Sequence, residues 1–168
     1  MTTQPRSVVV GIVPGQSDDV VLQAAMFASR FEAQLVCAFV ETSRYVVEEL
    51  ADGSVRSLPF DPDLPELRDE VFDPELAAHL ESLLSARNVR WSTRALAGDP
   101  ARALGHLAEA VDAAMIVVGT RRTSSRRGIR EFFGGSVAAQ LAHRQHRPVV
   151  VIPQAPVSIE QPLPWEPA

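Results

Sequence analysis

Lysine is entirely absent from this sequence of 168 residues, so all 16 of its basic residues are arginines. A Walker-type nucleotide-binding loop needs a lysine that reaches the phosphates, and Schiff-base catalysis needs a lysine amine. Both classes of site are therefore excluded. Arginine is a good bidentate partner for phosphate, so the missing lysine leaves anion binding open.

Cysteine and long apolar runs are scarce as well. Cys37 is the single cysteine and lies within an apolar segment, which predicts a buried thiol without a disulfide partner in the chain. No apolar run approaches the roughly 20 residues that span a bilayer. The N-terminal segment MTTQPRS also lacks the pattern of a signal peptide. These features predict a soluble cytoplasmic protein without a membrane partner.

Apolar runs and turn signals alternate along the chain as expected of an α/β protein. Buried strands are predicted at residues 7–13, 34–40, 89–97, 115–118 and 149–152. Helices are predicted at residues 18–31, 73–87 and 101–111 and from Val137 onward. Two of these helices follow Asp-Pro pairs, which supply an N-cap and a proline at the first helical position. The expected fold is a doubly wound, five-stranded parallel sheet with helices on both faces.

Two further segments lie outside this alternation. Residues 45–50 and 54–58 flank Ala51-Asp52-Gly53, and the Asp-Gly pair is a strong signal for a β-hairpin. We expect this insertion, at about residues 43–60, to stand over the carboxyl ends of the strands. There it would be a lid on a ligand, an interaction surface or an ornament without a role. Residues 1–153 are expected to form one domain, followed by a proline-rich tail at residues 154–168.

The most informative segment joins the last two predicted strands. Between Gly119 and Ser136 the chain has five arginines and one acid, a local charge of +4, whereas the whole chain carries −5. Gly134 and Gly135 precede Ser136 at the start of a predicted helix, and a helix N-terminus offers free N–H groups to an anion. We favour a phosphate site over the alternative of a solvated loop with a tight turn and an N-cap.

Other combinations of reactive residues are not evident. His143 and His146 have the i, i+3 spacing of metal ligands, but no third ligand lies nearby in the sequence, so no metal site is predicted. No Ser-His-Asp, Cys-His or paired-carboxylate motif can be recognised, so no catalytic residue is assigned. The net charge of −5 argues against nucleic acid as a partner.

Residues 119–153 resemble the nucleotide-binding motif of the universal stress protein family. That motif consists of Gly, two residues, Gly, nine residues, Gly and then Ser or Thr, followed by a helix and a final apolar strand. Gly119 is similar to the first glycine of the motif, and Gly135 and Ser136 are similar to its closing pair. The resemblance extends over nearly the whole chain, from residue 7 to residue 153.

Two features of the family motif are altered. Arg122, or Ser125 when counted back from Gly135, stands where the second glycine belongs, and the interval between the outer glycines is longer. The first strand of family members usually ends in an aspartate that contacts the base or ribose. Here that position is Val13, followed by Pro14.

The resemblance implies a strand order of 3-2-1-4-5 and a homodimer joined through the last strand, residues 149–152. It further implies a regulator of the stress response that binds adenine nucleotide, with ATP and Mg²⁺ as the cofactors and at most weak ATP hydrolysis. The alternative is a family member that has lost ATP and serves as a protein-interaction module through its hairpin and tail.

The nucleotide is expected at the carboxyl ends of the first and fourth strands, which are neighbours in this order. The expected ligand-binding residues are Val13, Pro14, Phe39, Val40, Gly119, Arg121, Arg122, Arg127, Gly134, Gly135, Ser136 and Val137. Within this set, the glycines and Ser136 would hold the phosphates and the arginines would neutralise their charge. The residues that end the first two strands would meet the base and the ribose.

Overall fold

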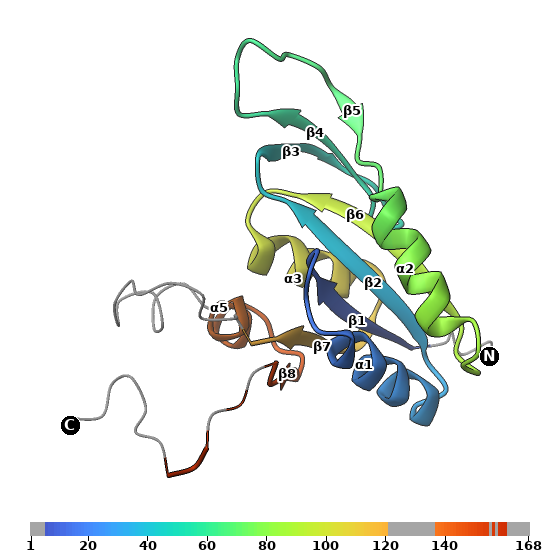
Figure 1. Ribbon diagram of the computed structural model, residues 1–168. Helices are drawn as coiled ribbons and strands as arrows, with labels where there is room; N and C mark the ends of the chain where they lie inside the picture. Colours follow the sequence, from blue (N-terminus) through green and yellow to red (C-terminus); the bar gives the residue numbers. More distant parts are fainter. Residues whose placement is uncertain (1–5, 121–136, 155, 157, 161–168) are drawn as a thin grey trace, which may run out of the picture.

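The computed structural model describes residues 6–120, 137–154, 156 and 158–160 (Figure 1). Its five-stranded sheet consists of β1 (Ser7–Ile12), β2 (Gln34–Glu41), β6 (Trp91–Ala97), β7 (Ala113–Gly119) and β8 (Val149–Ile152). The order is β6-β2-β1-β7-β8, and neighbouring strands are parallel. Counted along the chain among these strands, this is the expected 3-2-1-4-5. The doubly wound α/β fold is therefore confirmed.

The central strand β1 owes its position to a run of valines. Val8, Val9 and Val10 are each 0% exposed, which requires cover on both faces of the sheet. Because successive side chains of a strand point to opposite faces, Val8 and Val10 belong to one core cluster and Val9 to another. Both clusters continue into β2 and β7.

Two layers of helices provide this cover. On one face α1 (Asp18–Arg30) and α2 (Pro74–Leu84) pack around Val8 and Val10. On the other face α3 (Pro100–Ala110) and α5 (Val137–Arg144) pack around Val9. In the described part of the chain, none of the helices is long and apolar enough to cross a bilayer.

Capping residues fix the starts of these helices. The Asp73 carboxylate accepts a hydrogen bond of 2.8 Å from the backbone N–H of Leu76, and Asp99 accepts one of 2.8 Å from Arg102. In each case proline follows the cap, where its missing N–H has no cost. Ser17 caps α1 through a longer bond of 3.4 Å.

The insertion after β2 contains the predicted hairpin. β3 (Arg44–Glu49) and β4 (Val55–Pro59) pair in antiparallel fashion around Gly53, whose φ of +81° requires the left-handed region. A further strand that the sequence did not indicate, β5 (Arg68–Asp69), extends them to a three-stranded sheet.

The expected position of the hairpin over the carboxyl ends of the strands is wrong. Its turn reaches α3 instead, where Glu49 Oε1 lies 2.7 Å from His106 Nδ1 and a Cβ on Gly53 would lie 2.6 Å from Leu107 Cδ1. The physical reason is apolar burial, because Val55 is 7% exposed and belongs to the core cluster beneath α3. In Figure 1 the insertion lies beyond β6, along that edge of the sheet.

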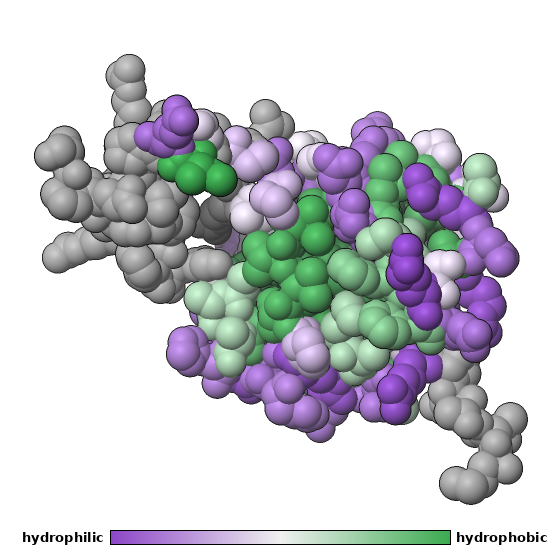
Figure 2. Space-filling view, turned by 90° about the horizontal axis from the view of Figure 1, so that it is seen from below, coloured by the Kyte–Doolittle hydropathy of each residue, from purple (hydrophilic) through white to green (hydrophobic). Residues whose placement is uncertain are grey.

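An apolar surface is exposed on the side of β8 and α1. Seen from below, green residues gather in the middle of the face (Figure 2). Exposed apolar side chains include Met26 of α1 at 37%, its C-cap Phe31 at 54% and Val151 of β8 at 44%. Val151 belongs to β8, which is the edge strand of the sheet.

Candidate functional site

The carboxyl ends of β2, β1 and β7 lie side by side. Ile12 pairs with Phe39, and Val10 pairs with Val117 two residues before the end of β7. After β1 the chain continues into α1 on one face, and α5, which lies later in the chain than β7, packs on the opposite face. In open α/β sheets, ligands bind at such a switch point beyond the carboxyl ends. We call the space beyond the ends of β1 and β7 the β1/β7 crevice.

The structure brings five of the predicted site residues to this edge. They end or follow the three adjacent strands and are Val13, Pro14, Phe39, Val40 and Gly119. Val137 lies at the start of α5 and packs against the core cluster beneath that helix. The remaining predicted residues lie outside the described part of the chain: Arg121, Arg122, Arg127, Gly134, Gly135 and Ser136.

The turn between β1 and α1 is short and internally bonded. Gly15 has φ of +73°, and the backbone N–H of Val13 donates to Gln16 Oε1 at 3.1 Å. The Gln16 side-chain nitrogen is buried and has no hydrogen-bond partner in the described structure. Val13 is 55% exposed. Its side chain is apolar and offers no hydrogen-bond acceptor.

Gln154, which no sequence motif marks, reaches the same place from beyond the end of β8. Its Oε1 accepts a hydrogen bond of 3.0 Å from the Ser17 backbone N–H, and its Nε2 donates to the carbonyl of Thr120. Its own backbone N–H donates to Thr120 Oγ1 at 2.9 Å. The residue lies in the predicted tail, where no motif marks it, and its contact with Ser17 spans 137 positions.

A carboxylate also lies at this edge, at the end of β2. Glu41 Oε1 accepts hydrogen bonds from the Ser43 backbone N–H at 3.0 Å and from its hydroxyl at 2.9 Å. These bonds stabilise the ionised form and hold the pKa of Glu41 below its ordinary value of 4.5. The group is therefore an anionic hydrogen-bond acceptor at neutral pH. Sequence reasoning missed it, although an acid that ends a strand was a readable signal.

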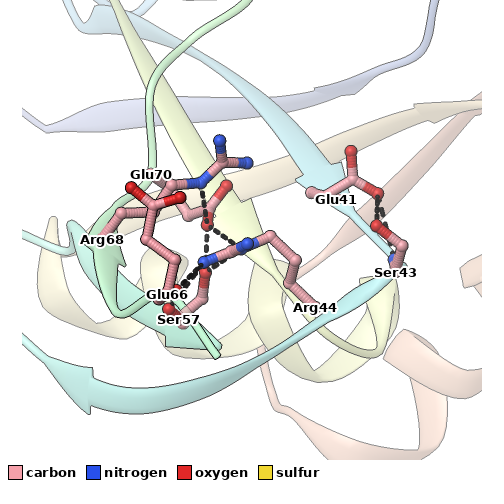
Figure 3. A network of polar contacts seen from close by, with 7 residues as sticks. All are labelled: Glu41, Ser43, Arg44, Ser57, Glu66, Arg68 and Glu70. Carbon is pink, nitrogen blue, oxygen red and sulfur yellow. Dashed lines mark hydrogen bonds and ion pairs between the residues drawn. The ribbon is translucent and has the colours of Figure 1, made fainter. Parts of the chain in front are cut away.

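The largest polar network of the insertion lies away from this edge. Figure 3 shows Arg44, Ser57 and Glu70 pointing toward one another, separate from the pair formed by Glu41 and Ser43. It links β3, β4 and the residue after β5, and its one hydroxyl, that of Ser57, is 0% exposed and donates to the Glu70 carboxylate, so solvent and substrate have no access to it. We therefore regard it as structural.

Two histidines, His79 and His106, join separate elements. His79 Nε2 lies 2.7 Å from Asp18 Oδ1 and links α2 to α1, while His106 lies against Glu49. No group of three or more His, Cys, Asp or Glu side chains suited to a metal ion occurs among the residues that the structure describes.

The sequence matches the model of the universal stress protein family over residues 5–153. Among solved structures, a universal stress protein in complex with cAMP is 23% identical, with a TM-score of 0.61, and the match covers 91% of this chain and 100% of that one. A universal stress protein from Archaeoglobus fulgidus in complex with dAMP is 17% identical, with a TM-score of 0.52 and coverage of 89% and 99%. No curated protein matches the sequence significantly.

UspA from Lactobacillus plantarum is 15% identical, with a TM-score of 0.55 and coverage of 90% and 99%. At these identities the structural similarity shows the fold alone. The family match is stronger evidence, because it spans β1 through β8 with the helices between them. The chain belongs to the universal stress protein family.

Proposed function

We propose that the protein binds an adenine nucleotide, ATP above all, and acts as a homodimeric regulator of the stress response in the cytoplasm. This proposal rests on one observation: Val13, Val40 and Gly119 all lie at the carboxyl ends of three adjacent strands. The family contains solved members in complex with cAMP and with dAMP, which supports an adenine nucleotide as the ligand class.

The base and ribose are assigned to the ends of β1 and β2. Val13, which is 55% exposed, and the partly exposed Val40 offer apolar contact to a flat base. Glu41 would accept hydrogen bonds from ribose hydroxyls, a role that an acid near the end of a second strand has in other doubly wound folds. It would thereby supply the carboxylate that position 13 lacks.

The phosphates are assigned to Gly119 and to the segment that follows it. Arg121, Arg122 and Arg127 would neutralise their charge, and Gly134, Gly135 and Ser136 would approach them with backbone and hydroxyl donors. Mg²⁺ would accompany ATP. No general base for hydrolysis is assigned, so any hydrolysis would be weak.

The homodimer is assigned to β8. This strand ends the sheet, and its Val151 is 44% exposed. An apolar edge strand with unpaired backbone groups is prone to association. Pairing with a second copy would cover both the backbone groups and the valines.

A calorimetric titration with Mg-ATP, ADP, AMP and cAMP tests the nucleotide proposal. The Arg121/Arg122→Ala variant should lose most of the affinity for ATP. Arg87/Arg90→Ala removes the same charge before β6, at the opposite end of the sheet, and should bind like the wild type. Absence of heat and of a thermal shift with every nucleotide would overturn the proposal.

A second candidate function is a protein-interaction module without a nucleotide. The observation in its favour is a concentration of exposed apolar side chains in the insertion, namely Tyr45, Val47, Leu50, Phe60, Leu64, Leu67 and Val71. The ring centroids of Tyr45 and Phe60 lie 5.4 Å apart. In this case a Tyr45→Ser/Phe60→Ser variant would fold normally and lose a partner that co-purifies with the wild type. Addition of a nucleotide would not change the amount of partner that co-purifies with the protein.

A further inference from the structure

Gln154 holds three parts of the crevice together. Its side-chain amide accepts from Ser17 at the start of α1 and donates to Thr120 just after β7, while its backbone follows directly from β8. The backbone N–H of Thr120 also donates to the carbonyl of Ile152 at 2.9 Å. Gln154 thus lies where the connections from β1 and β7 diverge.

The space that the amide occupies depends on Gly119. A Cβ at this position would lie 2.9 Å from Val20 Cγ2, closer than side chains tolerate, and 3.0 Å from Gln154 Cδ, which is a tight contact. The carboxamide therefore packs directly onto the backbone at the end of β7. It covers the same glycine that the proposed function assigns to the nucleotide.

The hydrogen-bonding groups that Gln154 uses are those that a ligand in the crevice would need. The Ser17 N–H is an unpaired donor of the first turn of α1 whenever Gln154 leaves it, and such donors favour phosphate or ribose oxygens. Gln154 presents a neutral oxygen to this donor. A charged phosphate oxygen would form the stronger bond, because hydrogen bonds with an ionised partner are roughly twice as strong.

We propose that Gln154 is an affinity-determining residue that competes with the nucleotide for the β1/β7 crevice. This inference rests on the proposed function and adds its regulation by a residue of the chain itself. In the ligand-free protein the side-chain amide accepts the hydrogen bond of the Ser17 N–H and covers Gly119. A nucleotide binds after the side chain has turned away, so the measured affinity is lower than that of the open crevice.

The test compares Gln154→Ala with the wild type in a titration with Mg-ATP. In this variant ATP no longer has to displace the hydrogen bond between Gln154 and the Ser17 N–H. ATP binding should therefore be about threefold to tenfold tighter. Gln23→Ala is the matched control, because Gln23 lies on the exposed side of α1 and its removal should leave the affinity unchanged. Gln154→Asn keeps the amide but is too short to reach Ser17, and it should also bind more tightly.

Amide hydrogen exchange of the ligand-free proteins provides a second readout. The Ser17 N–H should be protected in the wild type and in Gln23→Ala and should exchange faster in Gln154→Ala. Saturating ATP should shift the Ser17 amide resonance of the wild type. Thermal unfolding of each variant establishes that it is folded before its affinity is interpreted.

The outcomes separate the two proposals. Equal ATP affinity of the wild type, Gln154→Ala and Gln154→Asn would overturn the role of Gln154 while leaving nucleotide binding intact. Absence of binding by all of them would overturn the proposed function, and the competition with it. Tighter binding by both Gln154 variants, with faster exchange at Ser17, supports both.

Discussion

Arg44 and Glu70 form a buried ion pair, with Arg44 Nε 2.9 Å from Glu70 Oε1 and side chains that are 9% and 3% exposed (Figure 3). The Ser57 hydroxyl donates to the same carboxylate, and Arg44 Nη2 donates to the carbonyls of Ser57 and Glu66, each at 2.8 Å. The pair thus connects β3, β4 and the chain around β5. Because each charge is surrounded by partners, removal of one leaves the other unpaired and buried.

Glu70→Ala should therefore lower the free energy of unfolding by about 3–5 kcal/mol. Denaturant unfolding, with hydrogen exchange of the β4 amides to detect opening of the insertion alone, measures this. Glu48→Ala is the control, because its pair with Arg56 at 3.0 Å is about half exposed and solvent screens it, so its loss should cost far less. Equal losses in the two variants would contradict the assigned role of the buried pair.

Glu41 should make the protein less stable in acid. Its folded-state pKa is lowered by the Ser43 hydrogen bonds, so its contribution to stability is complete above about pH 4.5. The contribution is lost as the pH falls through the folded-state pKa. In Glu41→Gln this part of the acid dependence should disappear from unfolding curves measured across the acidic range.

Ser43→Ala should raise the pKa of Glu41 toward 4.5, as measured by NMR titration of the carboxyl group, because one of the two hydrogen bonds is lost. Asp52 provides an internal control. Its pKa is lowered by hydrogen bonds from Ser54 and should not change in this variant. A Glu41 pKa that stays the same would show that the Ser43 hydroxyl does not stabilise the carboxylate.

Gly119→Ala should destabilise the fold by about 1–3 kcal/mol, because the added methyl group overpacks the contact with Val20 and Gln154. Gly105→Ala is the opposite case. Gly105 lies within α3, and a Cβ there meets its nearest neighbours at 4.0 Å, so this change should stabilise the protein by about 0.4–1 kcal/mol. Urea unfolding of both variants tests the contrast, and destabilisation of the same size in both would refute it.

Val151→Lys should shift the protein from dimer to monomer, because it places a charge in the proposed β8 interface. Sedimentation equilibrium measures the change. Val47→Lys adds the same charge at a residue of β3 that is 52% exposed and should leave the dimer intact. A wild type that is monomeric at all concentrations tested would refute the interface.

Capping signals predicted the starts of helices more accurately than an apolar run predicted the start of a strand. The Asp-Pro pairs placed α2 and α3 correctly at Pro74 and Pro100. The strand predicted from residue 89 begins at Trp91, because the Val89 N–H bonds locally to the carbonyl of Arg87 and does not enter the ladder. An apolar run indicates burial, but backbone pairing decides where a strand begins.

The residues of the candidate site that strand order positions could be predicted from the sequence. Those positioned by contacts between distant parts of the chain could not. Val13, Val40 and Gly119 follow from strand order alone, because each ends or follows a neighbouring strand. The contact of Gln154 with Ser17 has no local signal. The Asp-Gly turn likewise revealed a hairpin, but only the packing of Gly53 and Val55 against the α3 side shows which surface it covers.

The place of the hairpin turn limits how the chain can be shortened or extended. Because Gly53 contacts Leu107 and Val55 is nearly inaccessible, excision of the insertion would expose leucine and alanine side chains of α3 to water. A minimal five-stranded version would need polar replacements on α3 as well. A fluorescent label or affinity tag is better joined near Asp61 and Leu64, where the chain between β4 and β5 is exposed.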